Sequence, residues 1–102
     1  VGIGGGADVA MKLGKKAVLR EIGSQNPDPQ AAALERELLE LVNRTGVGPM
    51  GVGGDSTCLA VHVEFTSRHP ASLPVGLLVQ CWADRRAQVR LAADSTAEVI
   101  RP

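Results

Sequence analysis

Residues 68–86 read RHPASLPVGLLVQCWADRR, and this stretch carries the strongest signals for both the fold and a reactive site. The short apolar run at 75–79 is flanked by turn formers, a pattern that predicts a buried strand. That strand would carry Cys81 to its far end, twelve positions after His69. The arginines at 85–86 would favour a thiolate, and thiolates bind soft metals and iron–sulfur clusters. The alternative is a buried cysteine that packs in the core.

Upstream of this stretch, residues 59–65 alternate strictly between apolar and polar or small side chains, which predicts a second strand. One face would hold Leu59, Val61, Val63 and Phe65, and the other Ala60, His62 and Glu64. These two strands and a third at residues 87–91 would form one antiparallel sheet.

Two helices are predicted before the strands. Residues 7–17 have apolar side chains at helical spacing and lysines near the C-terminal end, where the helix dipole favours positive charge. In the second helix, Asp28 is the expected N-cap, Pro29 is tolerated in the first turn and Gly46 is a natural stop. The expected apolar stripe is Leu34, Leu38, Leu41 and Val42, and the expected solvated face is Glu35, Arg36, Glu37 and Glu40. The predicted fold is α+β: two helices followed by a small antiparallel sheet, with the helices on one face, as part of a larger domain.

Composition narrows the possible partners. The 102 residues carry a formal net charge of zero, so nothing in the charge favours nucleic acid or an anionic membrane surface. We find no apolar run near the roughly 20 residues that span a bilayer. Two cysteines do not make a disulfide framework, which favours a reducing, cytoplasmic setting. We expect the chain to be part of a longer subunit.

The glycine-rich start of the chain allows two interpretations. Gly2, Gly4 and Ala7 satisfy a loose dinucleotide fingerprint, but that fingerprint requires a preceding strand and a second parallel strand after the helix, so nucleotide binding is disfavoured. A better functional interpretation is that amide groups at Gly4 and Gly5 bind an anion such as a substrate carboxylate. Close packing of the backbone is an equal alternative.

Four other polar residues need weighing. We expect Cys58 to pack, and His62 to be a solvated histidine on the polar face of its strand. His69 is a stronger candidate for a functional residue. Pro70 restricts the backbone conformation of His69, the residue that precedes it, and so restricts where the imidazole points. Arg85 is a weak candidate for carboxylate recognition, a task for which the guanidinium is well suited.

Taken together, these motifs resemble a known family. Residues 69–75 and 81–85 look like the final signature of the iron–sulfur hydro-lyases, the class I fumarases and L-tartrate dehydratases. Segments 1–5, 26–37 and 46–54 agree in the same order. The resemblance reaches about Leu91 and is nearest to the α-type part of fumarate hydratase. It implies that residues 1–92 are the C-terminal portion of an α-type domain, and that residues 93–102 are a tail or terminal strand of unknown role.

The resemblance implies a cofactor and roles for two residues. Members of the family are similar in using a [4Fe–4S] cluster held by three cysteines, with one iron left to bind substrate. Cys81 matches the last of these cysteines, and the other two fall before Val1 in the family pattern. His69 matches an active-site histidine near the substrate hydroxyl. The substrate-binding residues are unknown, and Gly4, Gly5 and Arg85 are weak candidates.

The same resemblance implies an activity and a partner. The expected reaction is the reversible dehydration of malate to fumarate, with L-tartrate as the alternative small dicarboxylate substrate. A non-catalytic α+β assembly module is the alternative from another class. The expected partner is a β subunit or a C-terminal β domain in an oligomer. This piece alone is expected to be inactive.

Overall fold

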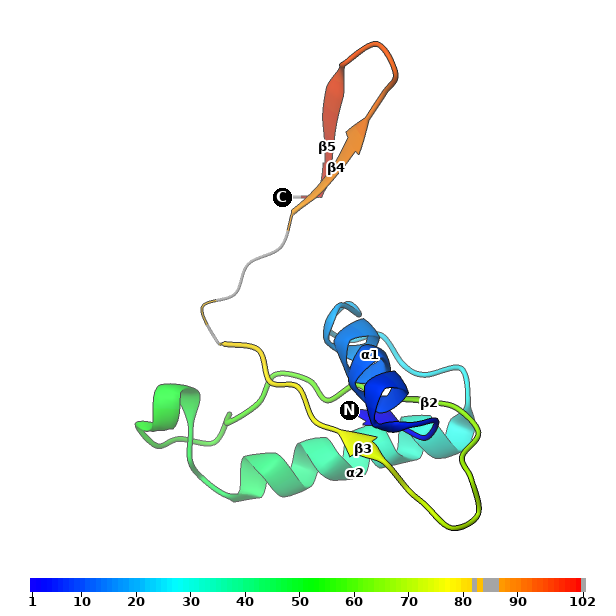
Figure 1. The fold of residues 1–102 in the computed structure, drawn as a ribbon. Coiled ribbons are helices and arrows are strands. Elements are labelled where there is room, and N and C mark those ends of the chain that lie inside the picture. Colours follow the sequence, from blue (N-terminus) through cyan, green and yellow to red (C-terminus); the bar gives the residue numbers. More distant parts are fainter. Residues whose placement is uncertain (82, 84–86, 102) are drawn as a thin grey trace.

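The computed structural model describes residues 1–81, 83 and 87–101 (Figure 1). It confirms the α+β class, because helices precede most of the strands and the strands form small sheets. In chain order the elements are β1 (Gly2–Ile3), α1 (Ala7–Val18), α2 (Pro29–Arg44), the short 3₁₀ turn η1 (Pro49–Gly51), β2 (Glu64–Phe65), β3 (Val75–Gly76), β4 (Gln88–Leu91) and β5 (Ala97–Arg101).

Both helices lie where local sequence signals put them. Lys15 and Lys16 occupy the last turn of α1, where the helix dipole is negative. At the start of α2, Asp28 Oδ1 accepts hydrogen bonds from the N–H groups of Gln30 and Ala31, at 2.8 and 3.1 Å. Two otherwise unpaired amides of the first turn are therefore satisfied. The chain leaves α2 through Gly46, whose φ of 66° is the predicted left-handed stop.

The buried face of α2 differs from the predicted one. Ala31, Ala32 and Glu35 are its buried residues, whereas Leu41 is 45% exposed. The prediction that Glu35 lies on the solvated face is wrong. Glu35 stands four residues after Ala31 and three before Leu38, which places it on the same side of the helix as the apolar stripe. The prediction placed Glu35 on the solvated face because its side chain is charged, although its position in the helical repeat lies on the buried face.

The main sheet has β1 in the middle, in the order β2-β1-β3. β2 runs parallel to β1, with Gly2 opposite Glu64, and β3 runs antiparallel, with Gly2 opposite Gly76. The prediction of a single antiparallel sheet is therefore wrong in its pairing. β1 has two residues and carries no periodic signal, yet it lies between two strands that were expected to belong to one antiparallel sheet without it.

The two longer predicted strands shrink to two residues each. Val63 is 1% exposed, but Leu59 on the same predicted face is 53% exposed. Beyond β3, Leu77 and Val79 are 68% and 86% exposed, so the expectation of a buried strand at 75–79 is wrong. An apolar run is buried only where other chain covers it, and β1 is too short to pair with more of either segment.

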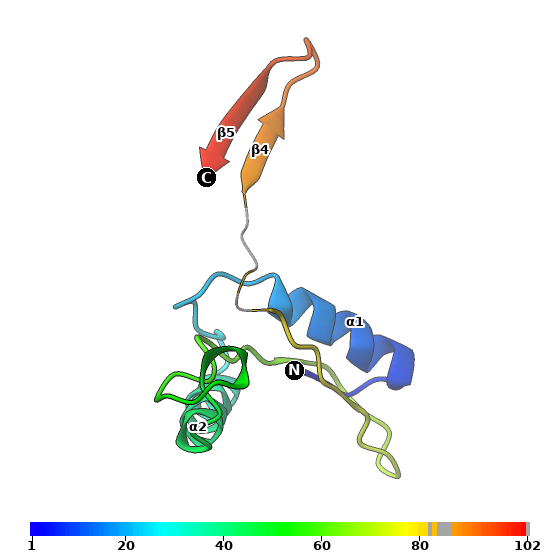
Figure 2. The same cartoon turned by 90° about the vertical axis from the view of Figure 1, so that its left-hand side faces the viewer.

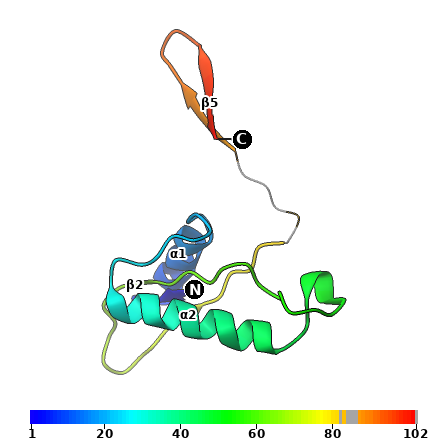
Figure 3. The same ribbon diagram turned by 180° about the vertical axis from the view of Figure 1, so that it is seen from behind.

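The two helices lie on opposite sides of this sheet rather than on one face, as Figures 2 and 3 show from the side and from behind. α1 packs directly against all three strands. The contact is close because Gly2 has no side chain: a Cβ there would collide with the carbonyl oxygen of Ala10. The buried apolar residues are correspondingly small: Ala10, Ala17, Ala31, Ala32 and Val63.

The predicted strand at 87–91 exists as β4, but it does not join the main sheet. It pairs antiparallel with β5, with Val89 opposite Val99 and Arg90 opposite Glu98. Figure 1 shows this hairpin standing apart from the two helices. Among the described residues, no helix combines the length and apolar character needed to cross a membrane.

Candidate active site

The loop that carries His69 is fastened at both ends to the turn between β1 and α1. The amide of Gly5 donates to Ser67 O at 2.9 Å, and the amide of Gly4 donates to Pro74 O at 2.9 Å. Gly4 has a φ of +95°, and a Cβ there would collide with Thr66 O. These two amides thus bind the protein's own loop. Substrate binding through them stays a prediction.

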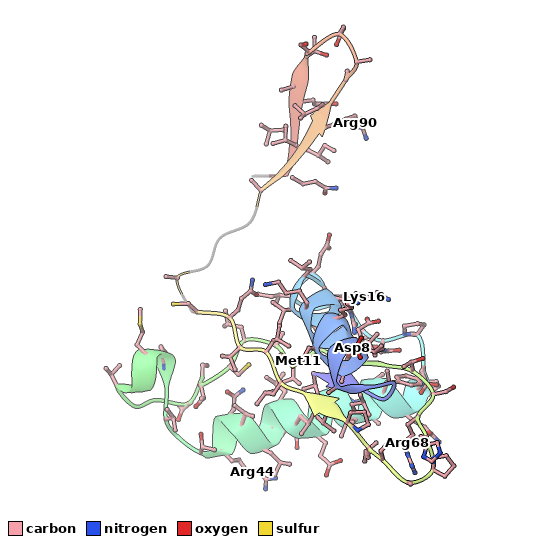
Figure 4. The ribbon with its side chains drawn as sticks, in the orientation of Figure 1. Asp8, Met11, Lys16, Arg44, Arg68 and Arg90 are labelled. Carbon is pink, nitrogen blue, oxygen red and sulfur yellow. The ribbon has the colours of Figure 1, made fainter. Side chains whose placement is uncertain are left out.

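Within this loop, His69 is exposed and its ring takes part in the turn. His69 Nδ1 accepts a hydrogen bond from the Ala71 amide at 3.1 Å, and His69 O accepts one from the Ser72 amide at 3.0 Å. The guanidinium of Arg68, which is labelled in Figure 4, donates hydrogen bonds to carbonyl groups of the same turn. The imidazole is therefore oriented by its own loop, which agrees with the expectation that Pro70 restricts it.

Cys81 lies elsewhere, at the edge of an open groove of about 900 Å³. The groove runs between the C-terminal end of α1, residues 57–62 and residues 77–81. The Cys81 side chain is exposed, and its Sγ accepts a weak hydrogen bond from the Ala83 amide at 3.5 Å. A sulfur that accepts an N–H bond at an exposed position is accessible to a metal.

The structure does not bring His69 and Cys81 together. His69 is absent from the described lining of the groove that holds Cys81, and that both residues face one cavity in the complete enzyme stays a prediction. His69 lies in the loop before β3 and Cys81 follows after it, so the two residues lie beyond opposite ends of this strand. Arg85, the weak carboxylate-binding candidate, lies outside the described residues. The roles of these residues stay predictions.

Two other polar residues line the Cys81 groove. Cys58 is half-buried, its thiol donates to Ala60 O at 2.9 Å and its amide donates to Asn43 Oδ1 at 2.8 Å. This geometry agrees with packing. His62 is half-buried as well, with Nδ1 3.2 Å from Ala17 O at the end of α1, so the expectation of a solvated histidine is wrong.

A buried polar network escaped the sequence-based prediction. Glu35 Oε1 accepts hydrogen bonds from the Val63 amide at 2.8 Å and from Arg20 Nη1 at 2.6 Å. Glu35 Oε2 accepts one from the Asn26 amide at 3.1 Å, and Asn26 Nδ2 donates to Val63 O at 2.7 Å. These four residues join α2, the end of α1 and the start of β2. Asn26 and Glu35 both lie in the segment 26–37 that carries the resemblance, which was the available signal.

Electrostatics favour the charged form of Glu35. Burial by itself raises the pKa of this carboxyl, but hydrogen bonds from Val63, Arg20 and Asn26 outweigh burial and hold the pKa below its usual range. A second acid, Glu64, lies 2.8 Å from Lys16 Nζ and 3.6 Å from Arg20 Nη1. The network is therefore a charged junction that fixes how the elements meet.

Metal-ligand chemistry is sparse in the part of the chain that the structure describes. No three side chains of the types histidine, cysteine, aspartate and glutamate converge there as a metal site. The described residues can therefore offer a cluster one exposed thiolate, at Cys81, rather than a complete ligand set.

Comparison with known proteins now decides the family. The family model described as fumarate hydratase (Fumerase) matches residues 1–90, which include the His69 loop and Cys81. The chain belongs to the fumarate hydratase (Fumerase) family. The predicted relationship to this family is confirmed.

Several named proteins are similar in sequence to this member of the fumarate hydratase family. A Methanocaldococcus jannaschii protein, provisionally named L(+)-tartrate dehydratase subunit alpha, is 57% identical over 95 residues, which are 93% of this chain and 33% of the relative. The L(+)-tartrate dehydratase subunit alpha of Escherichia coli strain UTI89 is 46% identical over 98 residues, 96% of this chain and 32% of the relative. The chain spans about a third of the length of these curated relatives.

Proposed function

We propose that residues 1–92 form the C-terminal portion of the α-type catalytic domain of a hydro-lyase that dehydrates a small hydroxydicarboxylate. The observation that carries this proposal is the family match across residues 1–90, with His69 in an ordered loop and Cys81 as an exposed thiol. Residues 93–102, which contain β5, have no proposed role in the reaction.

Cys81 is the proposed protein ligand of a [4Fe–4S] cluster. It is exposed and accepts an N–H hydrogen bond, which suits a thiolate. The two remaining thiolates would come from the part of the subunit that precedes Val1 in the family pattern. When bound, such a cluster supplies a Lewis acid that polarises the carbon–oxygen bond of the substrate hydroxyl. Cys58 is not proposed as a ligand, because its thiol is half-buried and donates to Ala60 O.

His69 is the proposed proton donor to the departing hydroxyl. Its exposed ring is held by the loop, so it can meet a substrate without first being ordered. For His69 and the Cys81 thiolate to act on one substrate, residues 77–81 must lie nearer to the loop in the assembled enzyme. β3 ends at Gly76, and Leu77 and Val79 are exposed, so this segment has apolar surface that can pack against further protein.

The family description and the names of the relatives support two different substrates. The family description favours L-malate and fumarate, whereas the names of the relatives favour L(+)-tartrate. The test is to load the full-length α subunit with cluster under anaerobic conditions, together with its β part, and to measure dehydration of both acids. A preference for one acid in kcat/KM assigns the substrate. Absence of turnover with either acid and a full cluster would favour the non-catalytic assembly module.

A β subunit, or a fused β domain, is the proposed partner, and it would supply most of the groups that bind the substrate carboxylates. The relatives' names as alpha subunits support this. We propose an oligomeric enzyme in the cytoplasm. Copurification of a tagged full-length α subunit from its own cells, followed by mass measurement of the complex, tests the partnership.

A further inference from the structure

The guanidinium of Arg68 organises the turn that follows it. Arg68 Nη1 donates to His69 O at 3.1 Å and to Pro70 O at 3.0 Å, with Ser72 O at 3.5 Å. A single charged donor therefore contacts three carbonyl groups within residues 69–72. Hydrogen bonds that involve a charged group are about twice as strong as neutral ones.

The same turn determines which nitrogen of His69 carries the proton. His69 Nδ1 accepts from the Ala71 amide at 3.1 Å. A ring nitrogen that accepts a hydrogen bond is unprotonated, so the neutral imidazole holds its proton on Nε2. Nε2 is also the nitrogen farther from the backbone, and the side chain is exposed. The loop thus presents an N–H donor outward.

Backbone hydrogen bonds fix the base of the loop. The Gly4 and Gly5 amides bind the carbonyl groups of Pro74 and Ser67, and the Thr66 amide donates to Ile3 O at 2.9 Å. Both ends of the loop are thereby attached to β1 and the turn that follows it. What remains to be held is the tip, and Arg68 is the side chain that reaches it.

We propose that Arg68 is a positioning residue for His69: by gathering the carbonyl groups of the turn, it keeps the Ala71 amide on Nδ1, so that His69 offers Nε2–H to the substrate. This inference rests on the proposed function, because it assumes that His69 meets the substrate. Arg68 itself is not proposed to touch the substrate. Its effect on turnover would pass through the orientation and the tautomer of the imidazole.

The test uses the full-length enzyme with its β part, in which Arg68→Gln is compared with Arg44→Gln. Arg44 is an exposed arginine in the last turn of α2, on a different element from the loop (Figure 4).

Nitrogen NMR of ¹⁵N-histidine-labelled enzyme reports the tautomer, with the His69 signal assigned by its loss in His69→Asn. We expect the Nδ1-unprotonated form in the wild type and in Arg44→Gln, and a mixture of tautomers in Arg68→Gln. We also expect Arg68→Gln to lower kcat by up to about 10²-fold, with less change in KM and the same cluster absorbance.

A second variant keeps the proposal falsifiable if Arg68→Gln disturbs the fold. Ala71→Pro removes the amide that binds Nδ1 and leaves Arg68 in place, so it should also mix the tautomers and lower kcat. A wild-type tautomer together with wild-type kcat in Arg68→Gln would overturn the role of Arg68. Unchanged turnover in His69→Asn would instead overturn the proposed role of His69 as proton donor, whatever the NMR of Arg68→Gln shows.

Discussion

Arg20 and Glu35 form a largely buried ion pair, with 2.6 Å between Arg20 Nη1 and Glu35 Oε1 and exposed side-chain fractions of 15% and 6%. The pair joins the chain just after α1 to the middle of α2. The Val63 amide shares the same carboxylate oxygen, so the start of β2 is held at this junction as well.

We expect Glu35→Gln to destabilise the protein by about 3 kcal/mol, because it removes the nearer of the two carboxylates that face the largely buried Arg20 guanidinium. Glu37→Gln, on the exposed face of the same helix, should stay within about 0.5 kcal/mol of wild type. Urea unfolding followed by circular dichroism measures both. Equal midpoints for the two variants would show that the carboxylate contributes nothing to the junction.

The contribution of Glu35 should depend on pH. Burial raises the pKa of its carboxyl, but the hydrogen bonds from Val63, Arg20 and Asn26 outweigh burial, and the folded-state pKa lies below the usual 4.5. Stability from such a group is fully present above the unfolded-state pKa and is lost as pH falls through the folded-state pKa. The gap in unfolding free energy between wild type and Glu35→Gln should therefore be constant near neutral pH and shrink below about pH 4.5. A gap that grows on acidification would contradict this.

Gly4→Ala should release the His69 loop from its base. Gly4 combines a φ of +95° with a Cβ direction blocked by Thr66 O, so we expect a loss of about 3 kcal/mol or more. Gly23→Ala is the matched control: its φ is +88° with open space around it, so the cost there should be about 1 kcal/mol. Limited trypsin digestion after Arg68 should speed up in Gly4→Ala and not in the control. Unchanged digestion would show that Gly4 does not hold the loop.

In the full-length enzyme, Cys81→Ser should abolish the visible iron–sulfur absorbance and the dehydration activity. A hydroxyl is a hard ligand and a poor substitute for a soft thiolate on iron. Cys58→Ser serves as the control and should retain the cluster, because the Cys58 thiol is half-buried and donates to Ala60 O. A full cluster with normal turnover in Cys81→Ser would end the assignment of Cys81 as a ligand.

His69→Asn in the full-length enzyme should retain the cluster and lose turnover by about 10²–10⁴-fold, the usual contribution of a positioned proton donor. Absorbance spectra and steady-state rates on L-malate and L(+)-tartrate measure the two properties separately. Near-normal turnover with an intact cluster would leave His69 as a structural loop residue.

Local sequence determined the helices, because a helix is built from contacts within a few residues. Asp28 caps α2 through amides two and three positions away, and Gly46 can leave the helix in the left-handed region without a steric cost. The ordered motifs also determined the family, with Cys81 and His69 as the residues to test. Those inferences needed no knowledge of which segments meet in space.

Tertiary structure decided what depends on contacts distant in sequence. The two-residue β1 became the centre of the sheet because Glu64 and Gly76 pair with Gly2 from either side, a choice that no local pattern encodes. Glu35 became a buried residue because Arg20 and Val63 supply donors from elsewhere in the chain, and a carboxylate is tolerated in a core only when it is so satisfied. His69 and Cys81 stand apart because they lie beyond opposite ends of β3, and their spacing in sequence does not determine the distance between them in space.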